Sequence, residues 1–198
     1  MEFSIRGIGI IKEADIKMDG LTVIAGSNNS GKTTVGRALY AVTSAVEDLA
    51  EKQQQDQAKA VFYRIRKIVE PFDGWLSRSR FLLRKEEVSD DLISEVIGIN
   101  HIYNPGKRDY YIDLLFRLCE SMEKGSFIEL LIDNLRDVVG NSESAIRNEW
   151  EDHKEKIQKE CLGAREFVES FQQQTKKEFA YKMIEETLAV EFSNQAQS

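Results

Sequence analysis

One segment constrains the chain more than any other, and its sequence is Gly26-Ser27-Asn28-Asn29-Ser30-Gly31-Lys32-Thr33-Thr34. It has the P-loop pattern, which is a glycine, four residues, a second glycine, a lysine and then a serine or threonine. The apolar, β-branched run at 21–25 predicts a buried strand before it. The apolar residues after it recur at spacings of three and four, which predicts a helix: Val35, Leu39, Val42, Val46 and Leu49. We therefore expect a loop that joins a strand to a helix.

The residue types in this segment predict a nucleotide-binding site. Glycine at positions 26 and 31 lets the backbone turn and approach a ligand closely, so that the loop amides can form an anion-binding nest at a helix N-terminus. The ammonium of Lys32 can reach the β- and γ-phosphates, and the hydroxyl of Thr33 can ligate Mg²⁺. The expected binding residues are Gly26, Asn28, Asn29, Ser30, Gly31, Lys32, Thr33 and Thr34, with Thr33 as the metal ligand.

Composition sets only broad limits on the function. The chain has 198 residues, enough for one domain or one and a half, and a net charge of −7 that argues against a wholly basic nucleic-acid binder. No apolar signal region and no run of 18 apolar residues are found, so we expect a cytoplasmic protein without a membrane segment. The two cysteines, Cys119 and Cys161, lack metal-ligand spacing and are expected to be small core residues, not a disulfide.

Two strand-like runs precede the phosphate loop. Apolar residues between Phe3 and Ile11 predict the first, and alternation of apolar and charged residues over 14–18 predicts the second. Lys12-Glu13 is the expected turn of this antiparallel hairpin. With the run at 21–25, three strands are expected before the loop.

The hairpin and loop together resemble a known family. The sequence Ala-Asp-Ile-Lys-Met-Asp-Gly-Leu-Thr-Val-Ile-Ala, followed by the P-loop, resembles the start of ABC-type heads of bacterial AAA family ATPases. It is most similar to the structural-maintenance-of-chromosomes, RecF-like and overcoming-lysogenization-defect proteins, of which the loop interior Asn28-Asn29-Ser30 is typical. The resemblance covers about residues 1–50. Such heads often carry Asn-Phe-Arg where this chain has Gly7-Ile8-Gly9, so a basic residue near the nucleotide is absent at Gly9.

The resemblance implies an α/β fold with a P-loop NTPase N-terminal lobe of hairpin, strand, loop and helix at residues 1–60. A mostly helical insertion at 61–198 is expected to follow. The resemblance also implies ATP and Mg²⁺ as cofactors, hydrolysis by a dimer of heads, and a role in DNA repair or anti-phage defence. The chain carries no signature motif of such heads and no convincing Walker B Asp-Glu pair. We therefore expect it to bind ATP without turnover, its partner being a second ATPase head or a missing C-terminal half.

One stretch has the form of a Walker B strand. Leu130-Leu131-Ile132-Asp133 is an apolar run that ends in aspartate, but Asn134 follows where ABC-type heads carry a catalytic glutamate. Helical spacing also continues through this stretch, so we predict a helix. From Ser142 onward the pattern predicts packed helices, with a seam of Ile157, Cys161, Ala164, Val168 and Phe171.

Residues 61–85 combine basic and aromatic side chains, and two interpretations are open. The basic residues are Arg64, Arg66, Lys67, Arg78, Arg80, Arg84 and Lys85. With aromatic rings among them they could bind DNA or an acidic partner, which would make the chain a DNA-binding scaffold. They could equally be the solvated face of a helix whose buried stripe includes Val61, Ile65 and Ile68.

A further alternative is a non-hydrolysing, nucleotide-gated module that controls an effector protein.

Overall fold

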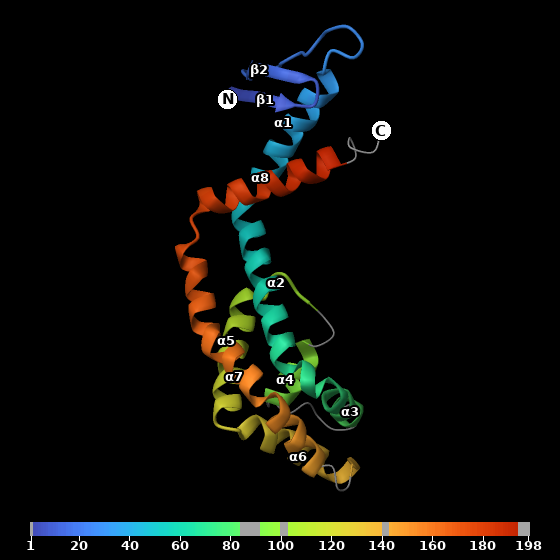
Figure 1. The fold of residues 1–198 in the computed structure, drawn as a ribbon, viewed down its shortest axis with the longest axis vertical. Coiled ribbons are helices and arrows are strands. Elements are labelled where there is room, and N and C mark those ends of the chain that lie inside the picture. Colours follow the sequence, from blue (N-terminus) through green and yellow to red (C-terminus); the bar gives the residue numbers. More distant parts are fainter. Residues whose placement is uncertain (1, 84–91, 100–102, 140–142, 194–198) are drawn as a thin grey trace. The chain divides into compact units, whose positions relative to one another are not determined.

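The computed structural model describes residues 2–83, 92–99, 103–139 and 143–193, and these form two compact units (Figure 1). The first unit contains Met1–Ala50 and Thr175–Ser198, and the second contains Glu51–Gln174. The described residues are mostly helical, and their one sheet is a two-stranded antiparallel hairpin. The predicted α/β class with a P-loop NTPase lobe is therefore wrong, because no sheet that continues from strand through loop to helix is present in the described part of the chain.

The first unit contains the hairpin and two helices. Strands β1 (Glu2–Ile8) and β2 (Ile11–Lys17) pair antiparallel, helix α1 (Lys32–Val46) contacts β1, and helix α8 (Lys176–Ser193) packs along α1. Their small core consists of Ile5, Ile11, Val35 and Ala38, with Ile8, Ala14, Ile16, Leu39 and Phe192 at its edge. The two strands alternate in burial, as expected for a ribbon with one face against a helix.

The hairpin is confirmed, but its turn lies earlier than the sequence predicts. Ile8 pairs with Ile11, so Gly9 and Ile10 form the two-residue turn, and Lys12-Glu13 lies within β2. Gly9 has a positive φ of 56°. A two-residue turn with glycine first suits the twist of a hairpin, which explains why the chain reverses here and not at a pair of charged residues.

The strand predicted at 21–25 is also wrong. This segment has no regular secondary structure and every residue in it is exposed, including Leu21 at 91%, Val23 at 77% and Ile24 at 41%. A strand is stabilised by hydrogen bonds and side-chain packing with neighbouring strands, and this segment pairs with neither β1 nor β2. An apolar β-branched run shows that a segment suits a sheet, but it does not show that neighbouring strands are available to pair with it.

The helix that follows the loop is interrupted once. Instead of running unbroken from Thr33 toward Ala60, it is divided into α1 and α2 (Leu49–Val69). Asp48 between them has a φ of 50°, in the left-handed region that aspartate tolerates better than most residues. The break ends the first unit's helix and begins the helix of the second unit.

The second unit is a helical bundle. After α2 come the 3₁₀ turn η1 (Glu70–Phe72) and helices α3 (Asp73–Leu83), α4 (Leu92–Ile99), α5 (Arg108–Glu123), α6 (Ser126–Val139) and α7 (Glu143–Gln173). Helix α5 packs against both α6 and α7. The described residues within 61–198 are mostly helical, but Thr175–Ser198 belongs to the first unit. The largest fully buried side chains of the second unit are Tyr111, Phe72, Phe127, Ile65, Ile68, Leu76, Ile93, Leu114, Leu115, Leu118 and Met122.

Candidate functional site

Helix α1 begins directly at the predicted phosphate loop. Its N-cap is Gly31, whose φ of 89° requires glycine, and the first backbone hydrogen bond runs from the N–H of Val35 to the carbonyl of Gly31 at 3.0 Å. The preceding amides, at 32–34, therefore come before the first intrahelical bond. No side chain in the described part of the chain caps this end of the helix, and its first turn contains no acidic residue. The positive end of the helix dipole is thus left for an external anion.

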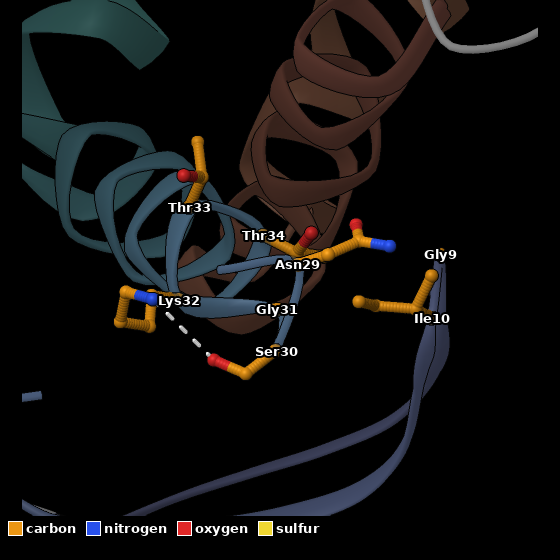
Figure 2. A pocket seen from close by; sticks show the side chains of 8 residues that line it. All are labelled: Gly9, Ile10, Asn29, Ser30, Gly31, Lys32, Thr33 and Thr34. Atoms are coloured by element: carbon orange, nitrogen blue, oxygen red, sulfur yellow. Dashed lines mark hydrogen bonds between the residues drawn. The ribbon is translucent and has the colours of Figure 1, made fainter. Parts of the chain in front are cut away.

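The loop and the hairpin turn line an open pocket (Figure 2). Its volume is about 450 Å³, and its lining consists of Gly9, Ile10, Asn29, Ser30, Gly31, Lys32, Thr33 and Thr34. Six of the eight predicted binding residues therefore lie around one space. Of the other two, Gly26 contacts the ammonium of Lys32, and Asn28 is exposed in the loop outside the lining.

The side chain of Lys32 curls back into its own loop. Its ammonium donates hydrogen bonds to the carbonyl oxygens of Gly26, at 2.8 Å, and Ser27, at 2.5 Å. It also lies 3.5 Å from the hydroxyl oxygen of Ser30, the contact that Figure 2 marks with a dashed line. These carbonyls hold the loop around the positive charge. Neutral carbonyl dipoles are weaker partners for an ammonium than phosphate oxygens are, so an anion in the pocket would compete for Lys32.

Two glycines allow this loop to close tightly. A β-carbon at Gly26 would lie 2.9 Å from the hydroxyl oxygen of Ser30, and one at Gly31 would lie 3.0 Å from a side-chain carbon of Ile11. A β-carbon at Gly26 would require the Ser30 side chain to shift, and one at Gly31 would require Ile11 to move by a few tenths of an ångström. At Gly31 the positive φ adds backbone strain for any other residue. The close contacts of both glycines are with side chains of this chain, so their predicted approach to a ligand stays a prediction.

The two threonines differ in their surroundings. Thr33, the predicted magnesium ligand, is exposed at the pocket, whereas Thr34 is buried. Mg²⁺ takes oxygen ligands and keeps several waters, so a hydroxyl such as that of Thr33 suits it only together with phosphate oxygens. Within the part of the chain that the structure describes, no group of three or more His, Cys, Asp or Glu side chains could hold a metal ion. The donor set therefore fits a magnesium–nucleotide complex better than a bare metal site.

Gly9 and Ile10 line the pocket, although no sequence motif marks them as site residues. The side chain of Ile10 is 58% exposed and points toward the loop, where it lies 3.4 Å from the β-carbon position of Gly31 (Figure 2). The signal that could have found them is the glycine at position 9, because a turn placed there brings the hairpin end beside the loop. With the turn predicted at Lys12-Glu13, Gly9 and Ile10 are not expected to lie beside the loop.

The basic residues at 61–85 are engaged within the second unit wherever the structure describes their side chains. Both Arg64 and Lys67 bind the carboxylate of Glu160, and Arg66 binds Asp73 at 3.2 Å. The guanidinium of Arg78 lies over the ring of Trp75, 4.7 Å from its centroid. The side chains of Arg80, Arg84 and Lys85 lie outside the described residues. The stripe of Val61, Ile65 and Ile68 is fully buried, which confirms that this segment is a packed helix.

The Walker B-like stretch is helical. Residues 130–133 lie within α6, as the spacing predicts, and Asp133 is exposed on that helix. A Walker B aspartate ends a strand, so the helix removes the structural basis of the likeness. The sequence also predicts a helix with Leu92, Val96 and Ile97 on one face, which α4 confirms. Ser89, the N-cap that the sequence suggests for it, lies outside the described residues.

Comparisons with known proteins add no family to this geometry. No family model, no curated protein and no solved structure matches the chain. None of the described helices is both long enough and apolar enough to cross a membrane.

Proposed function

We propose that this chain binds ATP together with Mg²⁺ through the loop at 26–34. The observation that carries the proposal is the pocket in which Lys32, the loop backbone and the uncapped N-terminus of α1 meet. A triphosphate is the ligand that uses all three, because its oxygens accept from backbone amides, pair with an ammonium and share a metal ion.

Binding would exchange the partners of Lys32. Its ammonium would leave the carbonyls of Gly26 and Ser27 for phosphate oxygens, a charge-assisted contact about twice as strong as a neutral hydrogen bond. The hydroxyl of Thr33 would hold Mg²⁺ against the same phosphates. The exposed side chain of Ile10 would form an apolar wall at the hairpin side of the pocket.

We further propose that the chain is the ATP-binding part of an ABC-type ATPase of the DNA-repair or anti-phage defence type. The support is the sequence resemblance over residues 1–50. Hydrolysis in such heads uses a glutamate after the Walker B aspartate and a signature motif from an opposing head. Neither is present in this sequence, so a partner polypeptide would supply them. Without that partner, this chain would bind ATP but would not hydrolyse it.

Calorimetric titration of the 198-residue chain with ATP and Mg²⁺ tests the binding proposal. Lys32→Ala should weaken ATP binding at least tenfold, because among the described residues that line the pocket it is Lys32 alone that carries a positive charge. Lys17→Ala is the matched control, since Lys17 ends β2 at the opposite end of the hairpin from its turn. Equal ATP affinity of the wild-type chain and the Lys32 variant would end the assignment.

The two alternative functions fare differently. A nucleotide-gated module that controls an effector would use the same pocket. It differs from the ATPase in that it would not hydrolyse ATP even when its partner protein is bound. A DNA-binding scaffold finds less support, because Arg64, Arg66 and Lys67 are paired with carboxylates. DNA binding that weakens steeply with salt would revive the scaffold.

A further inference from the structure

The chain contains two cysteines, and the fold of the second unit brings them together. Cys119 on α5 and Cys161 on α7 are both reduced, and they are 6% and 4% exposed in the same hydrophobic core. Helices α5 and α7 pack against each other. The two thiols lie within hydrogen-bonding reach of each other, and this contact is the largest influence on the pKa of both. Two thiols in direct contact differ from two separate core residues, because each is positioned to react with the other.

A positive charge is held beside this pair. The guanidinium of Arg64, from α2, is fixed by the carbonyl oxygen of Glu160 at 2.8 Å and by the ring of Phe167, whose centroid is 4.9 Å away. Its charge favours the thiolate form of both cysteines, whereas the carboxylates of Glu123 and Glu160 oppose it. A nearby arginine is one of the features that activate a cysteine.

The contact also makes the two thiols unequal. The hydrogen bond from Cys119 lowers the pKa of Cys161, and burial opposes this effect. The same hydrogen bond, together with burial, raises the pKa of Cys119. Cys161 is therefore the sulfur that ionises first, and Cys119 is the thiol that remains beside it.

We propose that Cys119 and Cys161 form a reversible disulfide, a redox modification site that links α5 to α7 inside the second unit. The oxidant would be a peroxide. The thiolate of Cys161 attacks one peroxide oxygen, the O–O bond breaks, and a sulfenic acid forms with release of hydroxide. The sulfur of Cys119 then attacks the sulfenic sulfur. The S–S bond forms as the S–O bond breaks, and the proton from Cys119 leaves with the hydroxyl group as water.

The link would change the stability of the second unit. It closes a loop of about forty residues that contains all of α6, and a cross-link across such a loop restricts the unfolded chain. We therefore expect the oxidised chain to melt about 5 °C or more above the reduced chain. Oxidation would thus hold α5 and α7 together without using the pocket at the phosphate loop.

Treatment of the purified 198-residue chain with hydrogen peroxide tests the proposal. The expected result is a loss of both free thiols and of two hydrogen atoms in the intact mass, with a peptide that joins Cys119 to Cys161. The chain should remain monomeric on a non-reducing gel, and dithiothreitol should restore both thiols and the lower melting temperature. Cys119→Ser and Cys161→Ser are the matched controls, and peroxide should raise the melting temperature of neither.

Two results would overturn the proposal, and both are read on the wild-type chain, so they do not depend on the folding of a variant. One is the survival of both thiols in the native chain under conditions that oxidise them in urea. The other is a gain of oxygen atoms at either cysteine in place of the loss of two hydrogens.

Discussion

The guanidinium of Arg64 occupies space that is open only because residue 163 is glycine. A β-carbon at Gly163 would lie 2.7 Å from a terminal nitrogen of Arg64, well inside contact distance. Arg64 uses this space to reach the carbonyl oxygen and the carboxylate of Glu160 and the ring of Phe167. One glycine on α7 thus allows a cation from α2 to be fixed against the helix.

This relationship predicts a coupling between the two positions. In an Arg64→Met background, Gly163→Ala should stabilise the chain by about 1 kcal/mol, because alanine favours a helix interior. With Arg64 present, the new methyl group displaces the guanidinium, and the gain should vanish or reverse. Urea unfolding of the four proteins should therefore give a coupling energy of about 1 kcal/mol or more.

Gly98→Ala is the matched control for this cycle. A β-carbon at Gly98 meets no atom within 4 Å, so its effect should be the same with and without Arg64. If Gly163→Ala stabilised both backgrounds equally, the position of Arg64 over the glycine would be wrong.

The carboxylate of Glu160 predicts a pH dependence of stability. A hydrogen bond from Lys67 lowers the pKa of this carboxyl, and burial opposes the effect. Because its pKa is lower in the folded than in the unfolded chain, the stabilisation is present above the unfolded value of about 4.3. It is lost as the pH falls through the folded pKa, where the carboxyl becomes protonated.

We therefore expect Glu160→Gln to cost about 1 kcal/mol of unfolding free energy at pH 7 and progressively less as the pH falls below about 4 toward pH 3. The measurement is urea unfolding of both proteins across this range. Glu155→Gln, at an exposed position of the same helix, is the control and should change little at either pH. A cost that stayed constant from pH 7 to pH 3 would show that the carboxylate charge is not what stabilises the contact.

We expect the exposed segment at 21–25 to accept a charged side chain with little change in the unfolding free energy. Val23→Lys should change the unfolding free energy by no more than about 0.5 kcal/mol, because the side chain of Val23 is 77% exposed. Were Val23 in a buried strand, as the sequence pattern indicates, an unpaired lysine there would cost several kcal/mol. Ile5→Lys is the contrasting control, since Ile5 is buried in the hairpin core. Strong destabilisation by the Val23 variant would support the buried strand.

How far the sequence predicts the structure depends on how local the cause is. The helical stripe of Val61, Ile65 and Ile68 was predictable because its spacing is a property of one segment, and burial confirms it. The run at 21–25 misled, because a strand depends on neighbours that the segment does not encode. Most loop residues of the site followed from one motif. Ile10 did not, because its place beside Gly31 depends on where a separate hairpin turns.

The last prediction is that this chain alone binds ATP but does not hydrolyse it. Attack on the γ-phosphate needs a positioned water, and the described side chains that line the pocket include no carboxylate that could position one. Contacts of the loop stabilise the bound nucleotide and the transition state almost equally, which gives affinity without rate. Phosphate release from purified wild-type chain should therefore match that of the Lys32→Ala variant, which reports contaminating activity. Asp133→Asn should leave both ATP binding and phosphate release unchanged, because Asp133 lies on helix α6 and not at the end of a strand, where a Walker B aspartate lies. Turnover of about 1 per second that disappears in the Lys32 variant would contradict the prediction and show that the chain carries a complete catalytic site.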